Sequence, residues 1–106
     1  MTDPVWLPRT VAEDIHAEQL TRHGGSPGLR DIGLLESALA RPQNTWGYGE
    51  TDVSELAALY AEGIARNHPF VDGNKRTAFM VAYAFLRANG LRLRAEKRCS
   101  VWPLAS

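Results

Sequence analysis

The side chains best suited to chemistry lie together in one stretch of the sequence, HPFVDGNKR, at residues 68–76. This stretch supplies one imidazole, one carboxylate, one amide and two cations immediately before the apolar run TAFMVAYAFL. A polar loop that leads into a helix suits phosphate chemistry, because the first amides of a helix are unpaired and the helix dipole adds positive potential there. Gly73 would let a phosphate approach the backbone closely.

Cations at the start of the expected helix are unfavourable unless an anion binds there. Lys75 and Arg76 would oppose the helix dipole by about 0.3–1 kcal/mol in an empty site. Each residue also has a structural explanation: Asp72 or Asn74 could cap the helix, and His68 could be an ordinary loop residue. The two cations could likewise pair with acids elsewhere. Because all these residues fall within one short loop, a phosphate site is favoured over the separate explanations.

Helices on both sides are expected to position this loop. Thr10 and Glu13 form a capping box for a first helix, which ends at Gly24. Asp31 caps a second helix, and Pro42 prevents that helix from continuing much further. Both helices carry apolar residues at helical spacing, so each should bury one face against the rest of the chain.

The third and fourth helices flank the loop directly. Asp52 and Glu55 form a second capping box, and the third helix should end just before His68 because Pro69 disfavours helical backbone there. The fourth helix is different, since residues 77–86 are apolar on every face and so predict the centre of a bundle. No stretch alternates as a strand would. The sequence therefore predicts a single all-α domain.

Length and composition limit the class of protein further. The 106 residues carry 12 basic and 12 acidic side chains, and 44% are hydrophobic, which indicates one globular domain. The longest strongly apolar stretch, residues 78–86, is too short to span a bilayer, and no basic segment followed by an apolar one opens the chain, so we expect neither a membrane span nor a secretory signal. We therefore expect a cytoplasmic protein that does not contact a membrane. The one cysteine, Cys99, can form no internal disulfide.

The net charge of zero hides a division between the two halves of the chain. Residues 1–62 contain ten acids and four arginines, a net charge of −6, whereas residues 63–106 contain eight basic residues and two acids, a net charge of +6. The basic half suggests an anionic ligand or an acidic partner, and simple solvation of the charges is the alternative. The cations that could meet such a partner are Arg87, Arg92, Arg94, Lys97 and Arg98.

The loop sequence resembles the signature motif of the Fic/Doc superfamily. Its form with a lysine at position 75 is similar to the Doc branch, the "death on curing" toxins. Two further stretches, GSPGLRDIGLLESALARPQ at residues 25–43 and ELAALYAEGIARN at residues 55–67, also resemble Doc proteins, so the resemblance covers about residues 4–93. It implies a compact Fic/Doc-like helical bundle, in which the active loop precedes a central buried helix.

The resemblance also implies a toxin kinase. Doc proteins transfer the γ-phosphate of ATP to a threonine of elongation factor Tu and so stop translation, and a Phd-like antitoxin neutralises them. On this basis His68 would be the general base, and Asp72 would bind the Mg²⁺ ion that bridges the phosphates. The residues that would hold the phosphates are Gly73, Asn74, Lys75 and Arg76.

Further expectations follow from the same resemblance. Residues Trp46, Gly47, Tyr48 and Gly49 occupy the place of the family's flap, which aligns the target segment. The antitoxin supplies DNA binding in this family, so we expect no direct contact between this chain and nucleic acid. The partners implied are therefore the antitoxin and elongation factor Tu.

Two departures from the family pattern leave alternatives open. Fic adenylyltransferases typically have Gly at the position of Lys75 and a second Arg at the position of Phe79, so transfer of AMP is the less favoured reaction. Doc relatives usually continue for about another helix, so the end of this domain, about residues 94–106, is expected to be irregular and shortened. The remaining alternative is a catalytically weak module that binds the antitoxin in a repressor complex.

Overall fold

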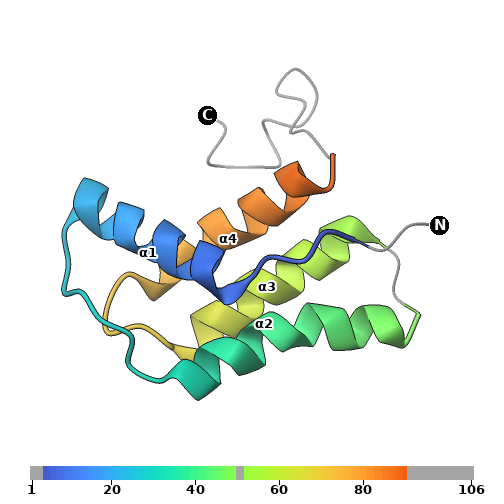
Figure 1. The fold of residues 1–106 in the computed structure, drawn as a ribbon, viewed down its shortest axis with the longest axis horizontal. Coiled ribbons are helices and arrows are strands. Elements are labelled where there is room, and N and C mark those ends of the chain that lie inside the picture. The colour runs from blue at the N-terminus through green and yellow to red at the C-terminus, as the bar shows by residue number, and fades with distance from the viewer. Residues whose placement is uncertain (1–3, 50–51, 91–106) are drawn as a thin grey trace.

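Four helices make up most of residues 4–49 and 52–90, the part of the chain that the computed structural model describes. They are α1 (Arg9–His23), α2 (Ile32–Gly47), α3 (Val53–Asn67) and α4 (Asn74–Ala88). The chain reverses direction between α2 and α3 and again between α3 and α4, and α1 packs against α4 (Figure 1). Within these residues there is no strand, only an isolated bridge between Leu29 and Phe70. The all-α prediction is confirmed.

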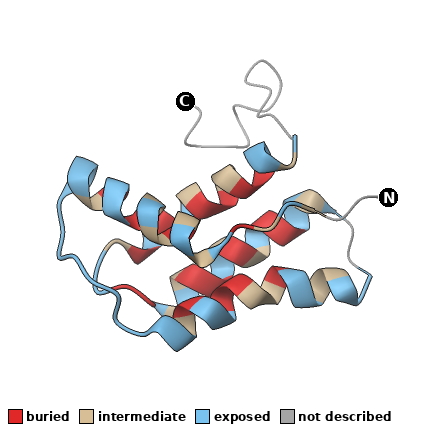
Figure 2. Cartoon of the chain, viewed as in Figure 1, coloured by how far each residue is buried: buried red, intermediate tan, exposed pale blue. Residues whose placement is uncertain are grey.

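The core lies where the facing sides of the helices meet (Figure 2). Tyr60 of α3 and Phe85 of α4 are fully buried there, with ring centroids 4.9 Å apart. Residue 63 is a glycine because α2 passes close to it: a Cβ atom at Gly63 would lie 3.0 Å from the Cβ atom of Ala38. Contacts along α3 and α4 hold these two helices against each other, and the loop joins them.

The start of α1 differs from the prediction. The residue before the helix is Pro8, no side chain caps the first turn, and Thr10 lies inside the helix. Glu13 instead lies 3.2 Å from the guanidinium of Arg9, one turn earlier on the same face. The predicted end is confirmed, because Gly24 follows the last turn at φ 79° and its amide donates to the Leu20 carbonyl.

The end of α2 also differs from the prediction. The predicted cap is confirmed, since Oδ1 of Asp31 accepts from the Leu34 amide over 3.1 Å. The helix does not stop at Pro42, however, and continues to Gly47. Proline removes one hydrogen bond inside a helix. Pro42 is fully buried here, so we attribute the continuation to packing of this turn against the core.

Helix α3 begins and ends close to the predicted positions, whereas α4 begins at Asn74, about one turn before the predicted apolar run at residues 77–86. Asp52 caps α3 by accepting from the Ser54 amide over 2.9 Å, and α3 ends directly before His68. Helix α4 is buried on one side only, and its Phe79 side chain is 44% exposed. The prediction that this helix is buried on every face was therefore wrong. None of the described helices combines the length and apolarity needed to cross a membrane. The predicted irregular end, residues 94–106, lies outside the described residues.

Candidate active site

The predicted loop, residues 68–76, is divided in the structure: residues 68–73 join α3 to α4, and residues 74–76 form the first turn of α4. The loop begins with a sharp change of backbone direction. His68 adopts left-handed backbone (φ 51°, ψ 56°), and its amide donates to the Ile64 carbonyl over 3.2 Å. As predicted, the residue before Pro69 leaves the right-handed helical region, although it becomes left-handed rather than extended. The turn leaves the His68 side chain exposed. The imidazole is therefore accessible to another molecule.

Asn74 holds the middle of the loop in place. Its side chain is buried, and it exchanges two hydrogen bonds of 2.9 Å with the backbone of Phe70, one through Oδ1 and one through Nδ2. Nδ2 also lies 3.5 Å from Nδ1 of His68, at the outer limit for a hydrogen bond. The Asn74 side chain thus positions the loop, and its backbone amide donates to no described residue.

The connection between α1 and α2, residues 24–31, forms backbone hydrogen bonds with the loop. Two successive amides of this connection donate to the Pro69 carbonyl, over 2.7 and 3.1 Å. In the other direction, the Val71 amide donates to the Gly28 carbonyl over 3.0 Å. The loop is therefore anchored by backbone hydrogen bonds to a segment about 40 residues earlier in the sequence.

The side chain of Arg30 adds two further hydrogen bonds to the same region. Its Nε donates to the His68 carbonyl over 2.7 Å, and its Nη2 donates to the Asn67 carbonyl over 2.9 Å. The sequence carried no signal for this role beyond the resemblance of residues 25–43 to Doc proteins. Arg30 is thus a part of the site that the motif alone does not reveal.

Both carboxylate oxygens of Asp72 accept a backbone hydrogen bond. Oδ1 accepts from the Gly73 amide over 2.8 Å, and Oδ2 accepts from the Ser26 amide over 3.2 Å. The hydrogen bond from Gly73, then that from Ser26, and the nearby charge of Arg76 lower the pKa of the Asp72 carboxyl below its ordinary value of 3.8. Because its pKa is lowered, the Asp72 carboxyl stays ionised at neutral pH. A carboxylate has about four acceptor positions, so room remains for a cation.

The first turn of α4 is open to a ligand. Gly73 precedes the helix at φ 75° and has no side chain to cap it. The backbone amides of Asn74, Lys75 and Arg76 donate to no described residue, and the Thr77 amide is the first to bond back, to the Gly73 carbonyl over 3.0 Å. Three adjacent unpaired amides at a helix start can bind one anionic group.

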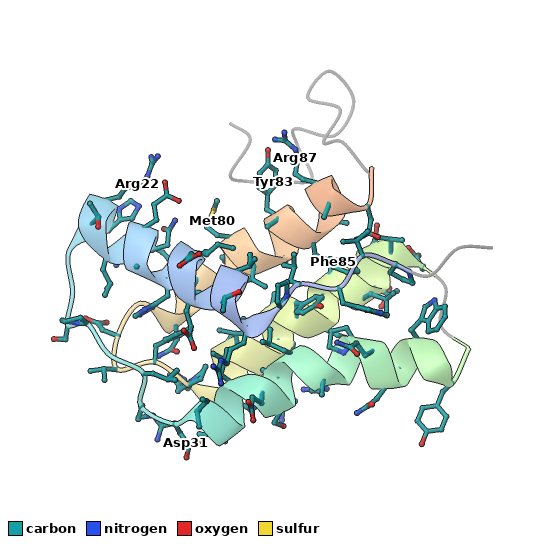
Figure 3. All side chains as sticks on the ribbon, in the orientation of Figure 1. Arg22, Asp31, Met80, Tyr83, Phe85 and Arg87 are labelled. Atoms are coloured by element: carbon teal, nitrogen blue, oxygen red, sulfur yellow. The ribbon has the colours of Figure 1, made fainter. Side chains whose placement is uncertain are left out.

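The two cations of the motif, in the first turn of α4, are also available to a ligand. Lys75 and Arg76 are exposed, and neither forms an ion pair with any residue in the described ranges. Arg87 behaves differently, because its Nη1 donates to the Tyr83 hydroxyl over 3.0 Å. Tyr83 and Arg87 both point away from the bundle on the same side of α4 (Figure 3). The other predicted partner contacts, Arg92, Arg94, Lys97 and Arg98, lie outside the described residues.

The donors present suit a Mg²⁺ ion that is bound together with phosphate. No three His, Cys, Asp or Glu side chains of the described residues converge on a metal site. Mg²⁺ is commonly held by one or two carboxylates, with substrate phosphates and water completing its shell. Asp72 supplies one ionised carboxylate directly before the unpaired amides of α4. Among the described residues, this donor set provides one carboxylate for a cation that is also bound by phosphate.

His16 also belongs to the site, although the sequence did not indicate it. This residue of α1 is 5% exposed, and its ring stacks on Phe70 with centroids 3.8 Å apart and planes 7° apart. Its Nε2 lies 2.7 Å from the carbonyl oxygen of Asp72. A single histidine in an amphipathic helix has no distinguishing pattern in the sequence, so this contact is visible only in three dimensions.

The predicted flap lies at the other end of α2 from the loop. Residues 46–47 form the last turn of α2 rather than part of a loop, and Tyr48 after them is 93% exposed. Trp46 packs edge-on against Trp6, which stacks on Phe85 near the end of α4. The loop meets the start of α2, and 16 helical residues span about 24 Å. The structure thus gathers the motif around the start of α4 but does not bring residues 46–49 to it (Figure 1).

Comparisons with known proteins find relatives that align with most of the chain. The sequence model of the Fic/DOC family matches residues 6–86. The chain is 45% identical over 87 residues to Toxin Doc of Mycolicibacterium smegmatis, across 79% of this chain and 66% of that protein. It is 42% identical over 80 residues to Protein kinase doc of Escherichia phage P1, across 74% of this chain and 64% of that protein. The alignments span slightly less than two thirds of these relatives, and they confirm the resemblance inferred from the loop.

Proposed function

This chain belongs to the Fic/DOC family, and on that premise we propose that it is a Doc-type toxin kinase. In this proposal it transfers the γ-phosphate of ATP to a threonine of elongation factor Tu, blocks translation, and is neutralised by a Phd-like antitoxin. The names of the two relatives, one a toxin and one a protein kinase, support the general class. The target and the antitoxin follow from the resemblance of the motif.

The observation that carries the proposal is the open first turn of α4. Three unpaired backbone amides, of residues 74–76, lie beside two exposed cations that form no ion pair with a described residue, although the charge of Arg76 acts on Asp72. Without a ligand these cations oppose the helix dipole, whereas a polyphosphate satisfies the amides and the cations together. Phosphoryl transfer depends mainly on positioning and charge neutralisation, which is what this arrangement provides.

His68 and Asp72 complete the proposed reaction. The target hydroxyl gives its proton to the imidazole of His68 as its oxygen bonds to the γ-phosphorus. The bond from that phosphorus to the bridging oxygen then breaks, and ADP leaves. A neutral imidazole keeps one ring nitrogen that can accept this proton. Asp72 would hold Mg²⁺, which when bound with ATP neutralises charge on the phosphates.

Residue types in and after the motif favour phosphate transfer over AMP transfer. Lys75 stands where Fic adenylyltransferases typically have glycine, and its exposed ammonium adds charge beside the phosphate amides. Phe79 stands where those enzymes have a second arginine. The site therefore lacks one cation that is typical of AMP transfer and has one that is typical of Doc proteins.

Labelled ATP tests the proposal directly. The purified chain is incubated with elongation factor Tu and with ATP labelled at either the α or the γ position. We expect transfer of the γ label, reduced at least about 100-fold in His68→Ala, which removes the base. The matched control is His23→Ala, which removes an exposed imidazole from the end of α1 and should retain transfer.

Two outcomes would contradict the kinase proposal. Transfer of the α label would indicate an adenylyltransferase instead. No transfer of either label, combined with tight binding of an antitoxin peptide, would indicate the binding module that stands as the alternative.

A further inference from the structure

His16 connects α1 to the peptide unit between Asp72 and Gly73. Its Nε2 lies 2.7 Å from the Asp72 carbonyl oxygen. A carbonyl oxygen can only accept, so Nε2 must carry the hydrogen of this bond. The contact therefore selects one tautomer of His16, in which Nε2 is the protonated nitrogen.

The same peptide unit is held at its other end by the Asp72 side chain. In a trans peptide the carbonyl and the amide N–H point in opposite directions. When His16 holds the carbonyl, the Gly73 N–H is turned toward Oδ1 of Asp72, which accepts it over 2.8 Å. That N–H is also the largest cause of the lowered pKa of the Asp72 carboxyl. His16 thus acts on the carboxylate through one rigid peptide plane.

The imidazole is itself fixed by its surroundings. It stacks on Phe70, whose backbone is held on both sides by the buried Asn74 side chain. The ring also lies close to Gly73, where a Cβ atom would be 3.8 Å from Nε2 of His16. A buried ring with a neighbour on its face cannot turn freely, so the donor stays aimed at the Asp72 carbonyl.

We propose that His16 is a positioning residue: its Nε2–H fixes the Asp72–Gly73 peptide and thereby holds the Asp72 carboxylate where it can meet a cation bound to phosphate. The inference rests on the proposed function, because the ligand that the carboxylate meets is taken to be Mg²⁺ with ATP. Neither the loop motif nor the family match assigns this role to a residue of α1.

Two substitutions separate the hydrogen bond from the packing. His16→Phe keeps an aromatic ring against Phe70 and removes the donor. His16→Gln supplies a donor at a similar reach and removes the ring. His23→Phe is the matched control, since it makes the same replacement at an exposed position of the same helix. The melting temperature of each variant shows how far the fold is preserved.

The first measurement needs no ligand. In a ¹H–¹⁵N spectrum the amide resonance of Gly73 reports its hydrogen bond to Asp72. We expect a clear shift of this resonance in His16→Phe, and a position close to that of the parent protein in His16→Gln and His23→Phe. An unchanged Gly73 resonance in His16→Phe would overturn the proposal, as would equal shifts in the Phe and Gln variants at position 16.

The second measurement is the binding of ATP with Mg²⁺ by calorimetry. Loss of a group that orients a metal ligand typically costs about 10–100-fold in affinity. We expect at least a tenfold weaker binding in His16→Phe and near-parent binding in His16→Gln. A purely structural role predicts instead that affinity follows the melting temperature in all variants, and that result would overturn the proposal.

The tautomer of His16 provides a test in the unaltered protein, which stands even if a variant fails to fold. In protein with ¹⁵N-labelled histidine we expect His16 to be protonated at Nε2, and protonation at Nδ1 alone would overturn the proposal. If the proposed function is wrong, the result differs from the results that would overturn the role of His16. In that case the parent protein itself does not bind ATP with Mg²⁺, while the Gly73 resonance and the tautomer still report on His16.

Discussion

The guanidinium of Arg30 supports the backbone of His68 from a separate segment of the chain, with Nε 2.7 Å from the His68 carbonyl oxygen. The left-handed backbone of His68 costs a non-glycine residue about 1–2 kcal/mol. The carbonyls at the end of a helix also lack partners within it, and Arg30 satisfies two of them, those of Asn67 and His68. The Arg30 side chain therefore caps the end of α3 and fixes the direction in which the His68 side chain projects.

Replacement of Arg30 is expected to affect both stability and transfer. Arg30→Ala removes both hydrogen bonds, so the free energy of unfolding should fall by about 1–2 kcal/mol. Phosphate transfer should fall about tenfold or more, because misplacement of a reacting group is costly. The control, Arg22→Ala, removes an exposed pair with Glu18 and should change stability by less than about 0.5 kcal/mol. Urea denaturation and transfer of γ-labelled phosphate measure the two effects, and unchanged transfer in Arg30→Ala would contradict the assignment.

Much of the fold could be predicted because its helix boundaries depend on local signals. Asp31 and Asp52 cap their helices, and Gly24 ends the first, as the residue types indicate. The errors arose where packing outweighs local preference. Pro42 is buried inside α2, and the residues of α4 that the sequence placed in the core include the half-exposed Phe79.

The site was predictable only as far as it is continuous in the sequence. His68 and Asp72 lie in one loop, so a motif finds them. The residues that hold this loop, His16 and Arg30, come from segments about 40–55 positions earlier and show no pattern of their own. Residues 46–49 were assigned to the flap from their position along the chain. In the structure they lie at the end of α2, and the loop meets the start of that helix.

A methyl group at position 25 should disturb the Asp72 carboxylate. A Cβ atom at Gly25 would lie 2.9 Å from Oδ2 of Asp72, whereas one at Gly24 would meet nothing within 4 Å. Both glycines have positive φ, so both alanine variants carry backbone strain of about 1 kcal/mol. We expect Gly25→Ala alone to weaken binding of ATP with Mg²⁺ by about tenfold. Equal affinities of the two variants in calorimetry would show that the contact with Asp72 is unimportant.

The Asp72 carboxyl should titrate in the acid range. Hydrogen bonds from the Gly73 and Ser26 amides lower its pKa below 3.8. Since the folded pKa is below the unfolded one, this group adds stability above pH 3.8, and that contribution is lost as the pH falls through the folded pKa. The ¹³C shift of the carboxyl should give a midpoint below 3.8, and Asp72→Asn should remove this part of the acid dependence. A midpoint at or above 3.8 would contradict the two hydrogen bonds.

The Tyr60 hydroxyl should make the fold sensitive to alkali. Burial raises its pKa above 10.0, against the smaller opposite effect of the hydrogen bond that it accepts from the Leu7 amide over 3.2 Å. Because the folded pKa is raised, the stability that this group adds is complete below pH 10.0 and is lost as the pH rises through the folded pKa. Tyr60→Phe should cost about 1–2 kcal/mol at neutral pH, since the Leu7 amide loses its acceptor. Urea denaturation should then show the difference between variant and parent shrinking above pH 10.0, whereas a constant difference would mean that Tyr60 does not carry this dependence.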